Sequence, residues 1–219
     1  FKLNAEFDTI EDKINSYIIS GSVKDAKFNL VGNDSFDNIN FKFKAKDKLI
    51  KISDLNFNYQ NLNLSSESIK IKNEKSGVYF IKGDIENTKS LVNPNILFKL
   101  ANIKQNFLSN KEILFQSKNY FSFRLNQLKE LKNIKVDSTV NFDEIYFKNK
   151  HQNLIFLKDV KINSNYENNE FTADLVSNFT LSESLKLNND YKKNNLELSL
   201  QGIKNENIKI SGNISNEKT

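Results

Sequence analysis

Few residues in this chain have the chemistry that catalysis or metal binding needs. His151 is the one histidine, and it lies in the polar stretch KNKHQN. The chain has no cysteine, so it has neither a thiolate nucleophile nor a cysteine-based zinc site. Because no second histidine and no acidic cluster stands at ligand spacing around His151, we expect this residue to be a surface residue rather than a metal ligand or a base.

The acidic residues give no stronger signal. Asp84 and Glu86 are separated by one residue, which puts both on the same face of a strand. Paired carboxylates can act as general acid and base, but a solvated strand edge explains this pair without catalysis. The glycines form neither a phosphate-binding loop nor a dinucleotide fingerprint. We therefore expect a protein that is not an enzyme and that needs no cofactor or metal.

The formal net charge of +5 raises the question of an anionic partner. The lysines, however, alternate with apolar residues, as in FKFK at 41–44 and IKIK at 69–72, and never form a block. Such alternation is typical of a solvated sheet face. With Arg124 as the single arginine and no nucleic-acid-binding module, we expect no nucleic-acid partner. A weak attraction to anionic lipid headgroups stays open.

The elements that would position any site are strands. The stretch ISDLNFNYQNLNLSSESIKIK at 52–72 alternates apolar and polar residues, which predicts strands with one apolar and one wet face. Similar runs recur along the chain, including YIISGSV and KFNLVG near the start, and the stretches KDK, NEKSG and ENNE read as turns between them. We predict a mostly β protein built as a long antiparallel meander.

One segment departs from this pattern. Asn93 suits a helix N-cap and Pro94 the first helical position, and apolar residues then recur at helical spacing, which predicts one amphipathic helix at about 93–108. This helix could cap one end of the apolar face or lie in a membrane interface; the cap is favoured because its polar side is not strongly basic. Residues 111–131 fit either strands or a helical turn.

We expect the chain to be an excerpt of a longer protein. It has no methionine, and its apolar runs are far shorter than the ~20 residues of a membrane-spanning helix. We interpret residues 1–219 as one repetitive β-rich segment of a longer chain, interrupted by the helix. Gly21, Gly83 and Gly212 stand in similar surroundings, 62 and 129 residues apart, which suggests a repeat of sixty-odd residues.

The apolar face of such a sheet must be shielded from water. The sheet can pack on a second sheet, close into a barrel, or curl into a groove that admits an apolar ligand. The scattered phenylalanines form no aromatic girdles, which argues against a membrane barrel.

The succession FKFKAKDKLIKISDLNFNYQNLNLSSESIKIKNEKSGVYFIKGDIEN at 41–87 is similar to the repetitive β segments of AsmA-like proteins, the family that includes TamB and YhdP. The shared features are an I-x-D-L opening, an alternating strand, a polar turn, a second strand and G-D-I-x-N. LKNIKVDSTVNFDEIYF and NIKISGNISN are similar in style.

The resemblance implies a long, curled β-groove in the bacterial periplasm, anchored in the inner membrane by a segment outside this chain. Such a groove would carry phospholipid between the inner and outer membranes and so support outer-membrane homeostasis, with acyl chains as its partners and no catalytic residue. The alternative is a structural or adhesive extracellular β-sandwich domain without lipid binding.

In a groove formed by residues 52–85, each strand is expected to keep its parity and the turns to set the register. The residues expected on one concave face are Phe57, Tyr59, Leu62, Leu64, Ile69, Ile71, Tyr79 and Ile81. Their polar alternates, expected to be wet, are Asn56, Asn58, Asn63, Lys70 and Lys72.

Overall fold

The computed structural model describes residues 1–10, 13–29, 35–60, 62–75, 77–94, 96, 111–146, 156–180, 194–203 and 209–216. His151 and most of the predicted helix lie outside these residues. Pro94 and Ile96 are helical, and Ile96 N donates a hydrogen bond to Asn93 O at 2.9 Å, where the helix is predicted to begin. Since residues 97–110 are not described, the amphipathic helix stays a prediction.

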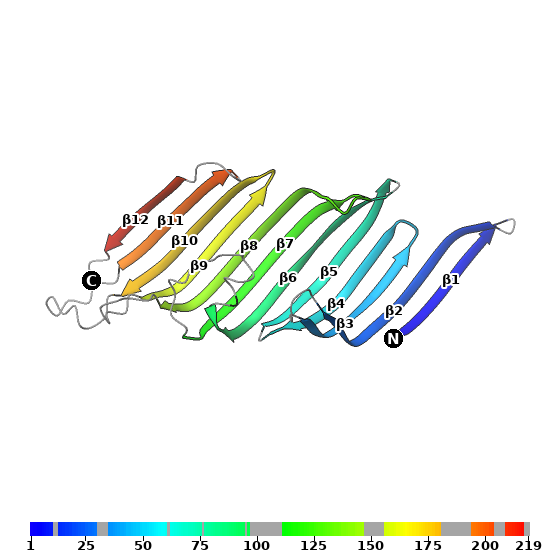
Figure 1. Ribbon diagram of the computed structural model, residues 1–219, viewed down its shortest axis with the longest axis horizontal. Helices are drawn as coiled ribbons and strands as arrows, with labels where there is room; N and C mark the ends of the chain where they lie inside the picture. Colours follow the sequence, from blue (N-terminus) through cyan, green and yellow to red (C-terminus); the bar gives the residue numbers. More distant parts are fainter. Residues whose placement is uncertain are drawn as a thin grey trace. The chain divides into compact units, whose positions relative to one another are not determined.

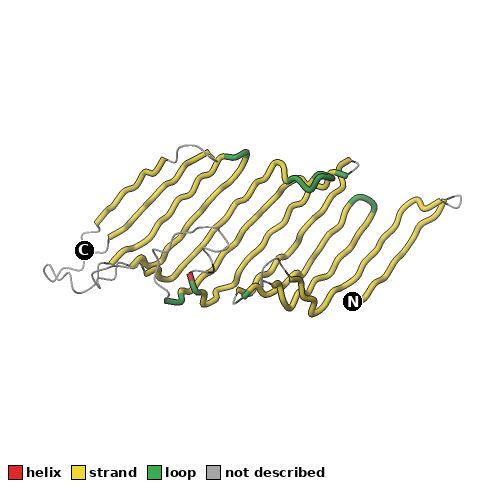
Figure 2. The backbone as a smooth tube through the Cα atoms, viewed as in Figure 1, coloured by secondary structure: helices red, strands yellow, loops and turns green. Residues whose placement is uncertain are grey.

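The described chain is mostly β, as predicted (Figures 1 and 2). Twelve strands form a sheet in which the strand order is the chain order, so that each strand lies beside its neighbours in the sequence. All the pairs with a resolved register are antiparallel. The strands are β1 (Lys2–Ile10), β2 (Lys13–Asn29), β3 (Ser35–Lys46), β4 (Leu49–Tyr59), β5 (Leu62–Lys75), β6 (Val78–Val92), β7 (Ile113–Leu125), β8 (Leu131–Tyr146), β9 (Phe156–Glu167), β10 (Glu170–Thr180), β11 (Asn194–Ile203) and β12 (Lys209–Asn216).

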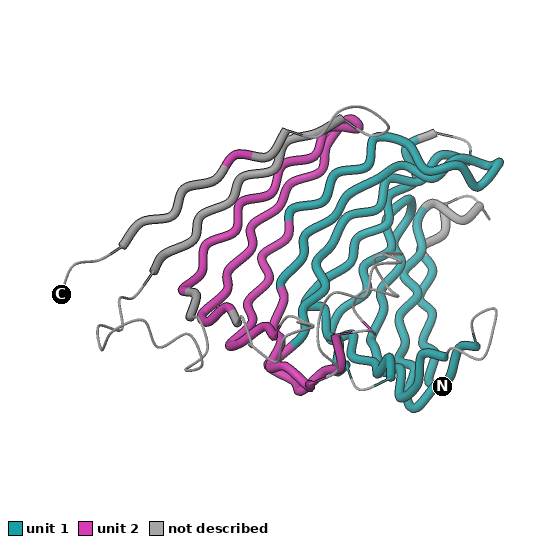
Figure 3. The backbone as a smooth tube through the Cα atoms, turned by 60° about the vertical axis from the view of Figure 1, so that its left-hand side comes forward, with its two compact units in different colours: residues 1–87, 118–137 teal, residues 88–117, 138–219 magenta. Residues whose placement is uncertain are grey.

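The chain divides into two compact units (Figure 3). Unit 1 comprises residues 1–87 and 118–137, and unit 2 comprises residues 88–117 and 138–219. Each unit is therefore made of two separate stretches of sequence. The stretches predicted to line a groove, residues 52–85, belong to unit 1.

The predicted turns are confirmed. Asp47 and Lys48 join β3 to β4, since Lys46 pairs with Leu49. Gly77 has a φ of 78° beside the pair Lys75 and Val78, a conformation that glycine adopts without strain. In the ENNE turn both central asparagines have positive φ, 52° and 69°, as a type I′ hairpin turn requires.

One prediction about strand limits is wrong, and one alternative left open by the sequence is decided. YIISGSV and KFNLVG were expected to be separate strands, but residues 13–29 form the single strand β2. Residues 111–131, ambiguous in the sequence, contain β7 followed by a turn in which Lys129 N donates to Asn126 O at 3.0 Å. Leu128, which allowed a helical turn, lies in this turn and is exposed.

Strand β2 stays continuous because a bulge at Asp25 absorbs one extra residue. Its register with β3 shifts between Val23 and Ala26, and Asp25 has a φ of 52°. A bulge of this kind moves the following side chains to the other parity without ending the strand. Asp and Asn are the non-glycine residues that tolerate this left-handed conformation best.

The same local sequence recurs at each described strand residue with positive φ. It is an apolar residue, any residue, Asp or Asn, then a second apolar residue. The five examples are VKDA at 23–26, FDNI at 36–39, ISDL at 52–55, LKNI at 131–134 and LKDV at 157–160. We call this the bulge pattern. VSNF at 176–179 matches it, but Asn178 has no positive φ and donates instead to Asp159 Oδ2 at 3.1 Å.

Polar side chains complete the hydrogen bonding around the bulges of unit 1. Asn40 Oδ1 accepts from Asp25 N at 3.0 Å, and Asn40 Nδ2 donates to Asn38 O at 2.7 Å. Asn40 also donates to Asn56 Oδ1 at 3.1 Å, and Asn56 lies over the bulge at Asp54. Backbone groups that the ladder leaves unpaired thereby find partners.

The bulge in β5 has a buried acceptor, Asp84. Its carboxylate accepts from Glu67 N at 3.1 Å and from Ser68 N at 3.3 Å, and Asp84 is only 8% exposed. The expectation of a solvated Asp84 is therefore wrong. Its carboxylate holds the β5 bulge.

Each unit has its own buried core. In unit 1 the buried apolar residues are Tyr59 and Leu62, at the turn between β4 and β5. Unit 2 buries more apolar side chains, among them Val92, Ile113, Phe115, Phe142 and Val160. The rings of Phe115 and Phe142 have centroids 5.3 Å apart. Large parts of the sheet outside these clusters are only half-buried.

Replacing Asp84 tests how far the β5 bulge depends on its carboxylate. Asp84→Ala removes the acceptor of two backbone N–H groups, so we expect a loss of about 1–3 kcal/mol in the free energy of unfolding, measured by urea denaturation. Asp84→Asn keeps one acceptor oxygen and should lose less. An Asp84→Ala protein as stable as the parent would contradict the proposed role of this residue.

Candidate functional site

The eight residues predicted to line a groove fall on one face of unit 1. Across β4 and β5, Phe57 pairs with Leu64 and Tyr59 with Leu62, and across β5 and β6, Ile71 pairs with Ile81. Directly opposed residues of antiparallel strands share a face. Ile69 and Tyr79 stand two residues from Ile71 and Ile81 and join the same side.

The two halves of this set share a face for a reason that differs from the prediction. Strand β5 does not keep its parity: Leu64 and Ile71 are seven residues apart, whereas their β6 partners Asn87 and Ile81 are six apart. Because Asn87 and Ile81 are an even number of residues apart, they lie on the same face of β6. Leu64 and Ile71 are an odd number apart, so they can share that face only if β5 contains a bulge. The register does shift, between Ser65 and Lys70. The bulge, not a turn, re-aligns the two halves.

The register also brings in residues that the sequence prediction missed. Opposed apolar residues form a row across six strands, which we call the apolar row: Ala5, Ile19, Ala45, Ile50, Ile71 and Ile81. A second row beside it contains Gly21, Phe43, Ile52 and Ile69. Ile50 and Ile52 have even numbers, whereas the apolar residues after Asp54 in β4 have odd ones, and the bulge pattern lies between them. This combination is the signal that could have identified Ile50 and Ile52 as residues of the same face.

Burial along this face changes from one end of the strands to the other. Tyr59 and Leu62 are 4% and 2% exposed, and the Phe36 ring contacts Phe57 edge-on with centroids 5.3 Å apart. At the opposite strand ends Ile50 is 38% exposed and Tyr79 39%. The apolar surface is therefore packed at one end and open at the other.

Two glycines of the suspected repeat, Gly21 and Gly83, lie under large apolar side chains. A Cβ on Gly21 would come within 2.8 Å of the Phe43 ring, and one on Gly83 within 2.9 Å of Ile69 Cγ1. Gly212 pairs with Leu198. However, Gly21 and Gly83 are four strands apart and Gly83 and Gly212 six, so the strand count does not repeat regularly.

The opposite face of unit 1 is polar. Among the alternates expected to be wet, Asn56, Asn63, Lys70 and Lys72 are exposed, and Asn58 is half-buried. Lys42 Nζ lies 2.8 Å from Asp54 Oδ2, and the hydrogen bond and charge of this aspartate raise the pKa of Lys42. Arg124 Nε donates to Glu74 Oε2 at 2.8 Å, which likewise raises the pKa of Arg124.

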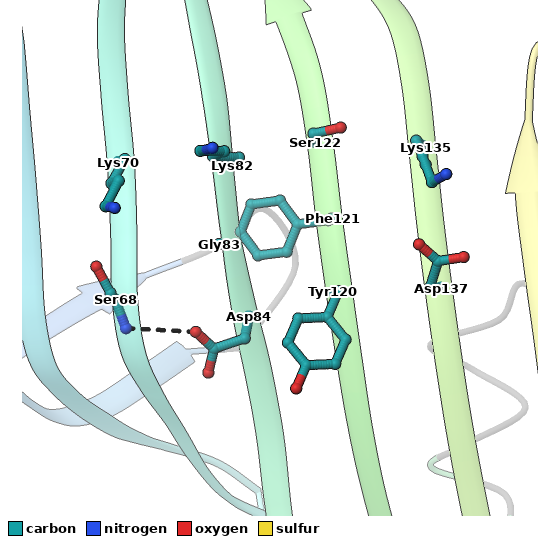
Figure 4. A pocket seen from close by; sticks show the side chains of 10 residues that line it. All are labelled: Ser68, Lys70, Lys82, Gly83, Asp84, Tyr120, Phe121, Ser122, Lys135 and Asp137. Atoms are coloured by element: carbon teal, nitrogen blue, oxygen red, sulfur yellow. Dashed lines mark hydrogen bonds between the residues drawn. The ribbon is translucent and has the colours of Figure 1, made fainter.

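A depression of about 350 Å³ opens on this polar face (Figure 4). Lys70, Lys82 and Lys135 line it together with Asp84 and Asp137. Asp84 is engaged by the β5 bulge, and Glu86 accepts instead from Ser65 Oγ at 3.4 Å. The two carboxylates thus serve separate neighbours and do not form an acid–base pair.

The described residues contain no group of three or more acidic or histidine side chains placed to hold a metal ion. In the same part of the chain, no helix has the length and apolar character needed to cross a bilayer. Comparison with known proteins gives no match: no family model, no curated protein and no solved structure is similar to the chain. The resemblance to AsmA-like proteins therefore stays a prediction.

Gly21→Ala tests how tightly the second row is packed. The added Cβ would contact the Phe43 ring and Lys2 O, and the carbonyl cannot retreat without disturbing the pairing of β1 with β2. We expect a loss of about 1–3 kcal/mol in the free energy of unfolding, measured by chemical denaturation. Phe43→Leu in the same chain should recover only part of it, because the clash with Lys2 O remains.

Ser22→Ala, next to Gly21 but on the other face, is the matched control and should change stability little. If both substitutions had equally small effects, the close packing of this row would be disproved.

Proposed function

We propose that the protein is a non-enzymatic lipid-transport segment that holds acyl chains on the apolar face of unit 1. The observation that carries the proposal is the apolar row, which crosses six strands and is partly exposed at Ile50. The described residues of unit 1 form strands and turns and supply no helix that could cover this face. A hydrocarbon ligand would remove this surface from water.

The dimensions of the row suit an acyl chain. Adjacent strands lie ~4.8 Å apart, so six strands span roughly 24 Å. Half of the ~30 Å hydrocarbon core of a bilayer, or about 15 Å, is the reach of one acyl chain in a leaflet. Each buried CH₂ contributes about 0.8 kcal/mol, so a continuous row would let a chain move without crossing a wet gap.

The curled groove belongs to this proposal. Bulges bend a strand and increase its twist, and in unit 1 they occur in the four neighbouring strands β2 to β5. A sheet bent in this way would give the apolar face a concave side. The predicted helix at 93–108 would cap one end of the groove, and a segment outside this chain would anchor it to the inner membrane on the periplasmic side.

A second function, a structural or adhesive β-domain without lipid, is favoured by one observation. Tyr59 and Leu62 are fully packed, and Phe36 contacts both Phe57 and Tyr59, as in a core filled by its own side chains. If the whole apolar face were covered in this way, no room would remain for an acyl chain. The two functions predict opposite results for a charge placed on the apolar row.

A photoreactive benzoylphenylalanine at position 50 tests lipid contact on the apolar row. Ile50 lies on the apolar face and Lys51 on the polar face of the same strand, so Lys51 provides the matched control position. After exposure to vesicles of pure phosphatidylcholine, we expect lipid adducts at position 50 and few at position 51, measured by mass spectrometry. Equal labelling at both positions would contradict the proposal.

The variant Ile71→Asp separates the two functions. An unpaired carboxylate on the row costs several kcal/mol in contact with hydrocarbon, so crosslinking at position 50 should fall severalfold while circular dichroism still reports a folded sheet. Leu62→Asp, at a packed position, should unfold the protein in either case. A cooperative loss of fold in Ile71→Asp would favour the structural function, and a folded variant with undiminished crosslinking would exclude the conduit.

A further inference from the structure

The register of unit 1 lines up lysines on the polar face. Lys44 of β3 pairs with Lys51 of β4, Lys51 with Lys70 of β5, and Lys70 with Lys82 of β6. We call these four residues the lysine row. Adjacent strands are ~4.8 Å apart, so four ammonium groups follow one another over roughly 15 Å.

Among the described residues, Asp84 and Asp137 line the depression beside Lys70 and Lys82 but form no salt bridge with them. All four lysines are exposed, and within the described chain none of them makes a salt bridge. The nearby acidic residues have other partners: Asp54 binds Lys42, Glu74 binds Arg124, and Asp84 binds the β5 bulge. Like charges directly opposed across strands are destabilising, so the row weakens the free protein.

A neighbouring row of paired residues, two positions further along each strand, extends the basic area along the strand direction. It contains Lys46, Leu49, Lys72 and Phe80, again as directly opposed residues, and Leu49 is 43% exposed. Lysine stems can lie along an apolar surface while their ammonium groups reach for anions. Exposed leucine between lysines is typical of a surface that meets both headgroups and the hydrocarbon beneath them.

These features fit a bilayer better than a nucleic acid. Recognition of nucleic acid draws on arginines and on aromatic rings that stack on bases. The lysine row contains neither. In the neighbouring row the Phe80 ring lies under the Arg124 guanidinium, 5.2 Å from ring centroid to Cζ, and Arg124 is bound to Glu74. Lysine acts as a point charge without directional preference, which suits an anionic surface whose headgroups move freely.

We propose that the lysine row and the adjoining Lys46, Leu49 and Lys72 form a docking surface for a membrane rich in anionic phospholipid. This surface lies on the face opposite the apolar row. The inference therefore does not depend on lipid transport.

Vesicle binding with the full chain tests the proposal. The parent protein should bind vesicles of equal parts phosphatidylglycerol and phosphatidylcholine at about 0.1 M salt, where the Debye length is about 10 Å, and should not bind pure phosphatidylcholine. Each lysine near an anionic surface strengthens binding about fivefold, so changing Lys44, Lys51, Lys70 and Lys82 together to Gln should weaken it on the order of several hundredfold.

The matched control changes Lys2, Lys24, Lys129 and Lys161 to Gln, which also lowers the net charge from +5 by four, to +1. This control should retain most of the binding. If both variants lost equal amounts of vesicle binding, net charge alone would explain the effect and the proposal would be overturned. Binding of the parent protein to neutral vesicles as tight as to anionic vesicles would also overturn it. Tighter binding to single-stranded RNA than to anionic vesicles at equal phosphate concentration would overturn it in favour of a nucleic-acid partner.

Discussion

The fold depends on keeping the two-residue alternation in phase across neighbouring strands. A β-strand longer than ten residues that alternates without interruption must match its neighbours over its full length, and one extra residue moves all later side chains to the other face. In β4, Ile50 and Ile52 have even numbers, whereas Phe57 and Tyr59 have odd ones. These residues share a face only because the backbone bulges at Asp54.

The bulges stay in phase because neighbouring strands bulge at the same level. The register of β4 with β5 runs without a shift from Leu49 to Tyr59, although Asp54 has a left-handed backbone and β5 bulges opposite it. Each bulge leaves backbone groups without ladder partners. Asn40 and Asp84 bind such groups from the adjoining strands, and Asn56 binds Asp54 O within its own strand. The polar face thus stabilises the conformation that keeps the apolar face continuous.

Local chemistry made much of this fold predictable. Alternation identified the strands, and Gly77 and the paired asparagines of ENNE marked turns whose φ angles the structure confirms. Alternation alone does not reveal the bulges: it predicts two strands in place of β2 and a single parity for β5. Their signal is an Asp or Asn between apolar residues three apart, and ISDL at 52–55 carries it.

The sequence pattern does not predict which residues pair across neighbouring strands, because the register depends on two separate segments of the chain. The alternation FKFK in β3 shows that phenylalanines and lysines take opposite faces, but not which residues they meet on β4. Once the aligned bulges lock the register, the apolar row and the lysine row arise together. A shift of β5 by one residue against β4 would move lysines to the apolar face. A shift by two residues would keep the faces but would separate the bulges, and Lys51 would then pair with Lys72 or Ser68 instead of Lys70. A change of register would therefore relieve the repulsion within the lysine row only by separating the aligned bulges, whereas an external anion would offset it with the register kept.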